Sequence, residues 1–161
     1  MNAAQLHLAL NHAPLFSLGF GLLVFLYSLL RKSTDVLRAG LYIFVLGAIL
    51  TIPAYLTGDG AEHVVENMAG VEKRLIEPHE EAATTAFVMT GLTGLAALAG
   101  LWLLRSQRTL PKLVTVSIFA LAILSIAVVG YTAKLGGMIH HPETRVGFVA
   151  PPSDDGEWEK D

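Results

Sequence analysis

Six histidines are the residues of this chain best suited to chemistry: His7, His12, His63, His79, His140 and His141. Imidazole is the commonest metal ligand among side chains, and a b-type haem iron can take one imidazole on each face of its ring. The 161-residue chain has no cysteine, which excludes disulfides, thiolate metal sites, iron–sulfur ligation and covalent c-type haem attachment. Two histidines from different segments would therefore suffice to hold a b-type haem.

His79 is the strongest candidate because a row of small residues follows it at helical spacing: Ala83, Ala86, Thr90, Gly94 and Ala97. Such a row lets a second backbone or a flat cofactor come close to the helix. We expect His79 to lie in the first turn of this helix, beside Glu80 and Glu81, where carboxylates favour the positive end of the helix dipole. Its ring should then point into a helix bundle.

The second axial ligand is expected from four other histidines, in this order of preference: His12 and His141, then His7 and His140. A regular helix would turn at most one of His7 and His12 squarely toward the bundle, because the two lie on different faces. Glycines on the two candidate faces, Gly19 in phase with His12 and Gly94 in phase with His79, would give a porphyrin room between helices.

A Zn or Cu site is an alternative, with His79, His12 and His141 as the metal ligands. Imidazole suits both metals, and Glu80 or Glu81 could complete a zinc shell. No tight signature such as HExxH is present, so this alternative depends on side-chain type alone. A third interpretation is a non-catalytic structural or assembly subunit whose histidines are polar caps at a membrane boundary.

Composition predicts the fold class. The chain is 53 % hydrophobic and 16 % charged. Its apolar runs, at about residues 14–30, 36–56, 82–104 and 113–134, each approach the ~20 residues that a helix needs to cross ~30 Å of hydrocarbon. We predict an all-α, integral membrane four-helix bundle in one domain, residues 1–142, followed by a disordered acidic tail, residues 143–161. No basic patch with interleaved aromatic residues is present, which excludes nucleic acid as a partner.

The connections between the runs predict orientation and local structure. Two short basic segments join the first span to the second and the third to the fourth, so both should face the cytoplasm, with both termini on the periplasmic side of a bacterial inner membrane. No Lys or Arg precedes Arg31, so we expect the first span to be retained. We further expect Gly58 and Gly60 to end the second span. An amphipathic helix over residues 61–76, broken at Gly70, should follow, with His63 facing water.

Three stretches resemble a family of small bacterial four-helix membrane proteins classed as a domain of unknown function: LNHAPLFSLGFGLLVFLYSLLRKS, YLTGDGAEHVVENMAGVEKRLIEPHEEAA and LGGMIHHPE. His12, His79 and His141 are the positions that carry the resemblance. Relatives that look similar are sometimes joined to Rieske-type iron–sulfur domains, which implies a redox setting. The architecture is also similar to small b-type cytochromes of the cytochrome b561 kind. Those cytochromes place haems at both membrane faces, whereas the histidines here cluster on one side, which implies a single haem.

We therefore expect a membrane protein that holds one haem b near its periplasmic side. Its partners would be the lipid bilayer and either a periplasmic electron carrier or a respiratory complex, with oligomerisation and catalysis left open. Transport is disfavoured, because no span carries an ionisable residue near its midplane.

Overall fold

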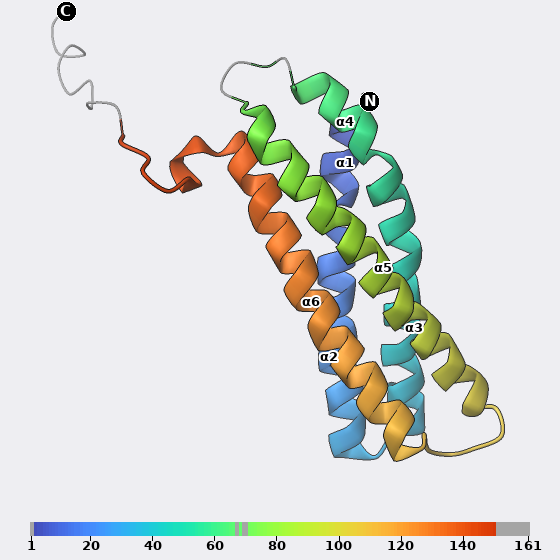
Figure 1. The fold of residues 1–161 in the computed structure, drawn as a ribbon. Helices are drawn as coiled ribbons and strands as arrows, with labels where there is room; N and C mark the ends of the chain where they lie inside the picture. The colour runs from blue at the N-terminus through green and yellow to red at the C-terminus, as the bar shows by residue number, and fades with distance from the viewer. Residues whose placement is uncertain (1, 67, 69–70, 151–161) are drawn as a thin grey trace, which may run out of the picture.

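A computed structural model describes residues 2–66, 68 and 71–150, and within them all regular secondary structure is helical. The elements are α1 (Ala3–Leu10), α2 (Ala13–Arg31), α3 (Thr34–Leu56), α4 (Gly58–Val65), α5 (Lys73–Leu103), α6 (Lys112–His140) and the 3-10 turn η1 (Pro142–Thr144) (Figure 1). Four stretches are long and apolar enough to cross a membrane: 3–31, 34–65, 73–103 and 112–140. The prediction of an all-α four-helix bundle is confirmed, and the chain is a multi-pass membrane protein.

The four long helices pack in the cyclic order α2, α3, α5, α6, so that α2 and α5 lie diagonally opposite each other. Small residues set the close approaches. A Cβ at Gly40 of α3 would lie 3.0 Å from the main-chain nitrogen of Phe25 in α2. Large apolar side chains, among them Leu30, Leu95 and Leu113, remain on the outside with more than half of their surface exposed. An apolar exterior around a core of interlocking helices is the arrangement expected in lipid.

The row of small residues after His79 is a helix–helix contact. Ala86, Thr90 and Ala97 are buried on α5. At Gly94 a Cβ would collide with the Cβ of Ala48 in α3 and lie 3.8 Å from the Phe44 carbonyl. Such a row could admit either a second backbone or a flat cofactor. At Gly94 the neighbour is the backbone of α3.

Helix α5 begins earlier than predicted, at Lys73 instead of near residue 82. His79 therefore lies in the second turn and not the first, and no acidic residue occupies the first turn. Pro78 does not stop the helix, because it is exposed near an end where water can hydrate the carbonyl that its missing N–H leaves free. Hydropathy marks where the lipid ends, whereas this helix continues beyond that level.

The other helix ends that the sequence predicted also differ from those in the structure. Gly58 and Gly60 lie inside α4, which follows α3 after the single residue Thr57. The amphipathic helix is consequently shorter than predicted and begins at Gly58. It ends at Val65, and the predicted break at Gly70 falls outside the described residues. Helix α6 passes through Gly136 and Gly137 to His140, beyond the predicted end at residue 134.

The two ends of the bundle differ in their connections (Figure 1). At the basic end, α2 joins α3 through Lys32, in the left-handed conformation at φ 50°, and Ser33, whose side chain caps α3. The α5–α6 connection lies at the same end. The opposite, outer end carries α1, α4, the start of α5 and the end of α6.

Candidate functional site

Two histidines meet at the outer end of the bundle. The ring centroids of His7 in α1 and His79 in α5 lie 6.5 Å apart, with their planes at 88°. Residues 3–31 form one candidate span, so α1 continues the path of α2, and α5 is the helix diagonally opposite α2. Both imidazoles are partly buried. The pair therefore lies between facing helices, which is where bundles place metal and cofactor sites.

His7 is held by the end of α3. Its Nδ1 lies 3.0 Å from the Ala54 carbonyl oxygen and 3.3 Å from the Thr57 hydroxyl. Ala54 belongs to the last turn of α3, where carbonyls lack partners within the helix. Helix α1 itself begins with a capping box between Asn2 and Gln5. These contacts attach a short terminal helix, and its histidine, to the bundle.

His79 is held by α6. Its Nδ1 lies 3.0 Å from the Thr132 carbonyl oxygen. One turn further along α6, a Cβ at Gly136 would come within 2.9 Å of the His79 Cε1. The ring thus lies against a position where only glycine leaves room. Gly136 lies beyond the apolar run predicted over residues 113–134, and the structure shows that it makes space for His79.

The two Nδ1 contacts orient both imidazoles in the same way. A carbonyl oxygen only accepts hydrogen bonds, so each Nδ1 must carry the proton and donate it. In the neutral ring, the lone pair available to a metal is then on Nε2. A hydrogen bond from the second nitrogen to a main-chain carbonyl is the usual partner of a metal-bound histidine. Both His7 and His79 make this hydrogen bond.

The structure brings His79 together with His7, which was a second choice, and with neither preferred partner. His12 is exposed at the start of α2, where it stacks on Phe16 with ring centroids 6.5 Å apart. His141 is exposed, and its Nδ1 lies 2.9 Å from a Glu143 carboxylate oxygen. The remaining two histidines, His63 and His140, are also exposed. His7, and not His12, is turned toward the bundle because it is in phase with Pro14 and Gly21, which are buried on α2, whereas His12 is in phase with the exposed Phe16.

The surroundings of the pair limit what it could hold. Ala48 closes the space at Gly94, so a flat ring could not lie at that level, and Gly19, which has no atom within 4 Å of where its Cβ would lie, is far from any contact with His79. Within the described part of the chain, no three His, Cys, Asp or Glu side chains gather as a metal site. A cofactor that fits must therefore accept two protein ligands and lie at the level of His79.

Asn11 supplies an unsatisfied polar atom near the pair. Its Oδ1 is buried and has no hydrogen-bond partner. The Asn11 amide donates to the His7 carbonyl at 2.8 Å, so Asn11 lies one helical turn beyond His7 on the same face. A buried oxygen without a partner is uncommon and costs stability, which is typical of a site that binds something.

One of the two carboxylates expected beside His79, that of Glu80, is directed toward α4. The Glu80 side chain is hydrogen-bonded to Glu62 of α4, with Asp59 and Glu77 nearby. A hydrogen bond between two carboxyl groups requires that they share a proton. Glu80 is thus engaged with α4, which removes it from the zinc shell considered from the sequence.

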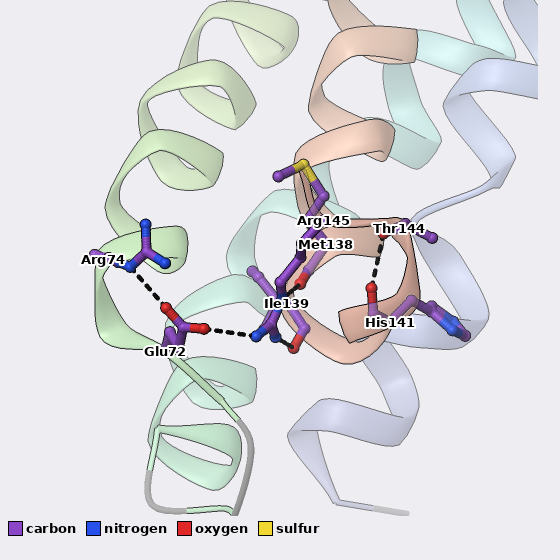
Figure 2. A network of polar contacts seen from close by, with 7 residues as sticks. All are labelled: Glu72, Arg74, Met138, Ile139, His141, Thr144 and Arg145. Atoms are coloured by element: carbon purple, nitrogen blue, oxygen red, sulfur yellow. Dashed lines mark hydrogen bonds and ion pairs between the residues drawn. The ribbon is translucent and has the colours of Figure 1, made fainter. Parts of the chain in front are cut away.

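Arg145 is a structural residue that the sequence did not single out. Figure 2 shows its guanidinium donating to the carbonyls of Met138 and Ile139, at 2.8 and 3.1 Å, and to Glu72 at 2.8 Å. Glu72 occupies the N-cap position of α5, without a side-chain cap bond, and also accepts from Arg74 at 2.6 Å. Arg145 therefore joins the end of α6 to the start of α5, the two helices that hold His79 and Gly136. It also anchors the tail to the bundle at residue 145.

Fold and site together define a class: a multi-pass, all-α membrane protein with a pair of partly buried imidazoles, each bonded through Nδ1 to a main-chain carbonyl, at one end of its bundle. Comparison with protein-family models, with curated proteins and with solved structures finds no match to this chain. The resemblance drawn from the three sequence stretches stays a prediction. Any functional assignment therefore depends on the geometry of the pair.

Proposed function

We propose that His7 and His79 are the axial ligands of one haem b and that the protein is a membrane electron-transfer protein or redox subunit. The observation that carries the proposal is the arrangement of the two rings. Their centroids lie 6.5 Å apart with the ring planes nearly perpendicular, and each ring has its Nδ1 on a main-chain carbonyl.

The ring separation favours ligands on opposite sides of one metal. Two imidazoles that bind a metal from opposite sides, with metal–nitrogen distances of about 2 Å, would have their ring centroids roughly 6 Å apart. At the tetrahedral angle that zinc prefers, the same bond length would bring the centroids to roughly 5 Å. The observed 6.5 Å is closer to the first value. Opposite ligation is the arrangement of a haem iron between two histidines.

The chain's own residues supply placement and orientation. The carbonyls of Ala54 and Thr132 hold both rings with Nε2 available, and Gly136 leaves the space in which the His79 ring lies. Asn11 offers an oxygen within one turn of His7. When bound, haem iron would supply reversible one-electron chemistry. The protein would tune it by burial and by the hydrogen bonds on Nδ1, which raise the basicity of the ligands.

The position along the membrane supports exchange with a partner outside the bilayer. His79 lies about 36 Å along α5 from Leu103 at the other end of the helix, which exceeds the ~30 Å of hydrocarbon. With the basic connections on the cytoplasmic side of a bacterial inner membrane, the pair would lie at the periplasmic boundary. A periplasmic electron carrier or a respiratory complex could approach it there.

A second candidate function is structural. His7 connects α1 to α3 and His79 connects α5 to α6, and both connections exist without any cofactor. In that case the histidines stabilise the outer end of an assembly subunit. The small residues of α5 would serve helix packing alone, as Gly94 does against Ala48.

The deciding measurement is a reduced-minus-oxidised visible spectrum of the full chain, purified in mild detergent after expression with ample haem. Sharp bands of a six-coordinate b-type haem are expected. His7→Gln and His79→Gln should each abolish them. His12→Gln and His141→Gln are matched controls, because both residues are exposed, and the bands should survive in them.

Each other outcome has a definite meaning. Bands that survive His79→Gln, or that disappear in His12→Gln, would overturn the assignment of ligands. A featureless spectrum with zinc or copper in elemental analysis would replace haem by the alternative metal site. A featureless spectrum with no metal would leave the structural function.

A further inference from the structure

A groove lies at the basic end of the bundle, far from the histidine pair. It has a volume of about 640 Å³ and is formed by α3, α5 and the residues that follow α5. Its lining comprises Arg38, Tyr42, Leu98, Leu101, Trp102 and Arg105, together with Leu104. A volume of this size is in the range of small-molecule sites.

Two arginines give the groove its charge. Arg38 donates to the Leu104 carbonyl at 2.8 Å and to Asp35 at 3.2 Å, which uses two of the five N–H donors of its guanidinium. The side chain of Arg105 is exposed and forms no ion pair among the described residues. Asp35 itself is 93 % exposed, so it neutralises Arg38 only weakly. The groove therefore has a net positive end with unused donors.

The rest of the lining is apolar and aromatic. Trp102 and Tyr42 are each more than 60 % exposed, and Leu98, one turn before Trp102, is about half exposed. Helices α3 and α5 run antiparallel, and the bond from Arg38 to the Leu104 carbonyl places the start of one beside the end of the other. From the two arginines, the apolar lining runs along both helices toward the membrane interior. Tyr and Trp are enriched at this boundary.

We propose that this groove binds an anionic phospholipid, with its phosphate on Arg38 and Arg105 and an acyl chain along Tyr42, Leu98 and Trp102. A guanidinium pairs with phosphate through two parallel hydrogen bonds. Basic pockets between membrane helices on the cytoplasmic side are the expected location of such headgroups. A zwitterionic lipid would lack the net charge that the two arginines match.

Trp102 allows a direct test. The chain has two tryptophans, so Trp158→Phe leaves Trp102 as the only reporter. The full-length variant is reconstituted in phosphatidylcholine bilayers that contain the same low fraction of brominated phosphatidylglycerol or brominated phosphatidylcholine. Brominated chains quench fluorescence on contact. We expect stronger quenching by phosphatidylglycerol, and Arg105→Gln should reduce its relative association constant about fivefold.

Arg105 is the preferred position because its side chain supports no contact in the fold, whereas Arg38 also caps α5. Arg108→Gln is the matched control: it removes the same charge from the same connection but lies outside the groove. It should leave the preference unchanged. Equal quenching by the two lipids, or an equal loss in both variants, would overturn the proposal. Inorganic phosphate should not reverse the preference, and a full reversal would mean that the groove binds free phosphate.

Discussion

At both ends of the bundle, side chains donate hydrogen bonds to main-chain carbonyls, but these bonds leave different groups free to bind a ligand. At the basic end, Arg38 donates to the Leu104 carbonyl and Thr34 to the Arg108 carbonyl, and these bonds fasten the two short connections. At the outer end, the donors to main-chain carbonyls are Arg145 and the imidazoles of His7 and His79. The guanidinium of Arg38 keeps unused N–H donors, whereas a neutral imidazole that donates from Nδ1 keeps a lone pair on Nε2. The basic end can therefore support the fold and bind an anion, whereas the outer end can support the fold and bind a metal.

The close packing at glycines shows a second difference. The nearest neighbours of Gly40 are main-chain atoms, the nitrogen and Cα of Phe25 at 3.0 and 3.1 Å from its built Cβ. The nearest neighbours of Gly136 are atoms of the His79 ring, which is a side chain and can move. The α2–α3 contact is thus rigid, while the outer end can adjust. An adjustable end is better suited to admit a ligand.

The largest loss of stability should come from a larger side chain in the rigid α2–α3 contact at Gly40. Gly40→Leu forces α2 away from α3 and should lower the free energy of unfolding by about 3 kcal/mol, the upper range for overpacked cores. Unfolding in detergent, followed by circular dichroism, measures the loss. Gly91→Leu is the control, because a Cβ at Gly91 meets no atom within 4 Å. Similar losses in both variants would mean that leucine disturbs these helices irrespective of contact.

An intermediate loss of stability, confined to the outer end, should come from removal of the Arg145 side chain. Arg145→Ala removes a guanidinium that is 15 % exposed and bonded to two carbonyls and Glu72, and should cost about 2 kcal/mol. Because those bonds hold the end of α6, amide hydrogen exchange should accelerate there and remain unchanged at the basic end.

Arg74→Ala is the comparison for this variant. Arg74 bonds to the same Glu72 carboxylate but is 78 % exposed, so its loss should cost well under about 1 kcal/mol. Equal costs for the two arginines would show that the carbonyl contacts of Arg145 contribute nothing. Faster exchange at both ends would show that the ends are not independent.

Sequence reasoning succeeded where hydropathy or small-residue periodicity carries the signal and failed where tertiary contacts decide. The four spans and the buried face of Ala86, Thr90 and Ala97 followed from pattern alone. The start of α5 did not, since a helix can continue beyond the lipid. Periodicity places His7 and His12 on different faces but does not say which face turns inward, so the choice of His12 was wrong. Arg145 is one of several charged residues in the acidic tail, and only the fold shows that it reaches back to α6.

The smallest effect concerns the tail at the outer end. A hydrogen bond from its own main-chain amide, and then one from His141, hold the pKa of Glu143 below its usual 4.5. A carboxyl group with a lowered pKa stabilises the fold above its unfolded pKa and loses that contribution as the pH falls through the folded value. Glu143 is fully solvated, so the change in stability should be slight and the titration itself is the better measurement.

Carbon-13 NMR of the Glu143 carboxyl group in detergent should give a midpoint below 4.5, and His141→Ala should move it upward. His140→Ala, which removes the neighbouring exposed imidazole, should leave it in place. The contacts of Arg145 with main-chain carbonyls do not titrate in this range, because a guanidinium stays protonated. Acid should therefore loosen η1 while Arg145 stays bonded to the end of α6. If acid instead released Arg145 from the end of α6, the anchor there would be the His141–Glu143 pair and not Arg145.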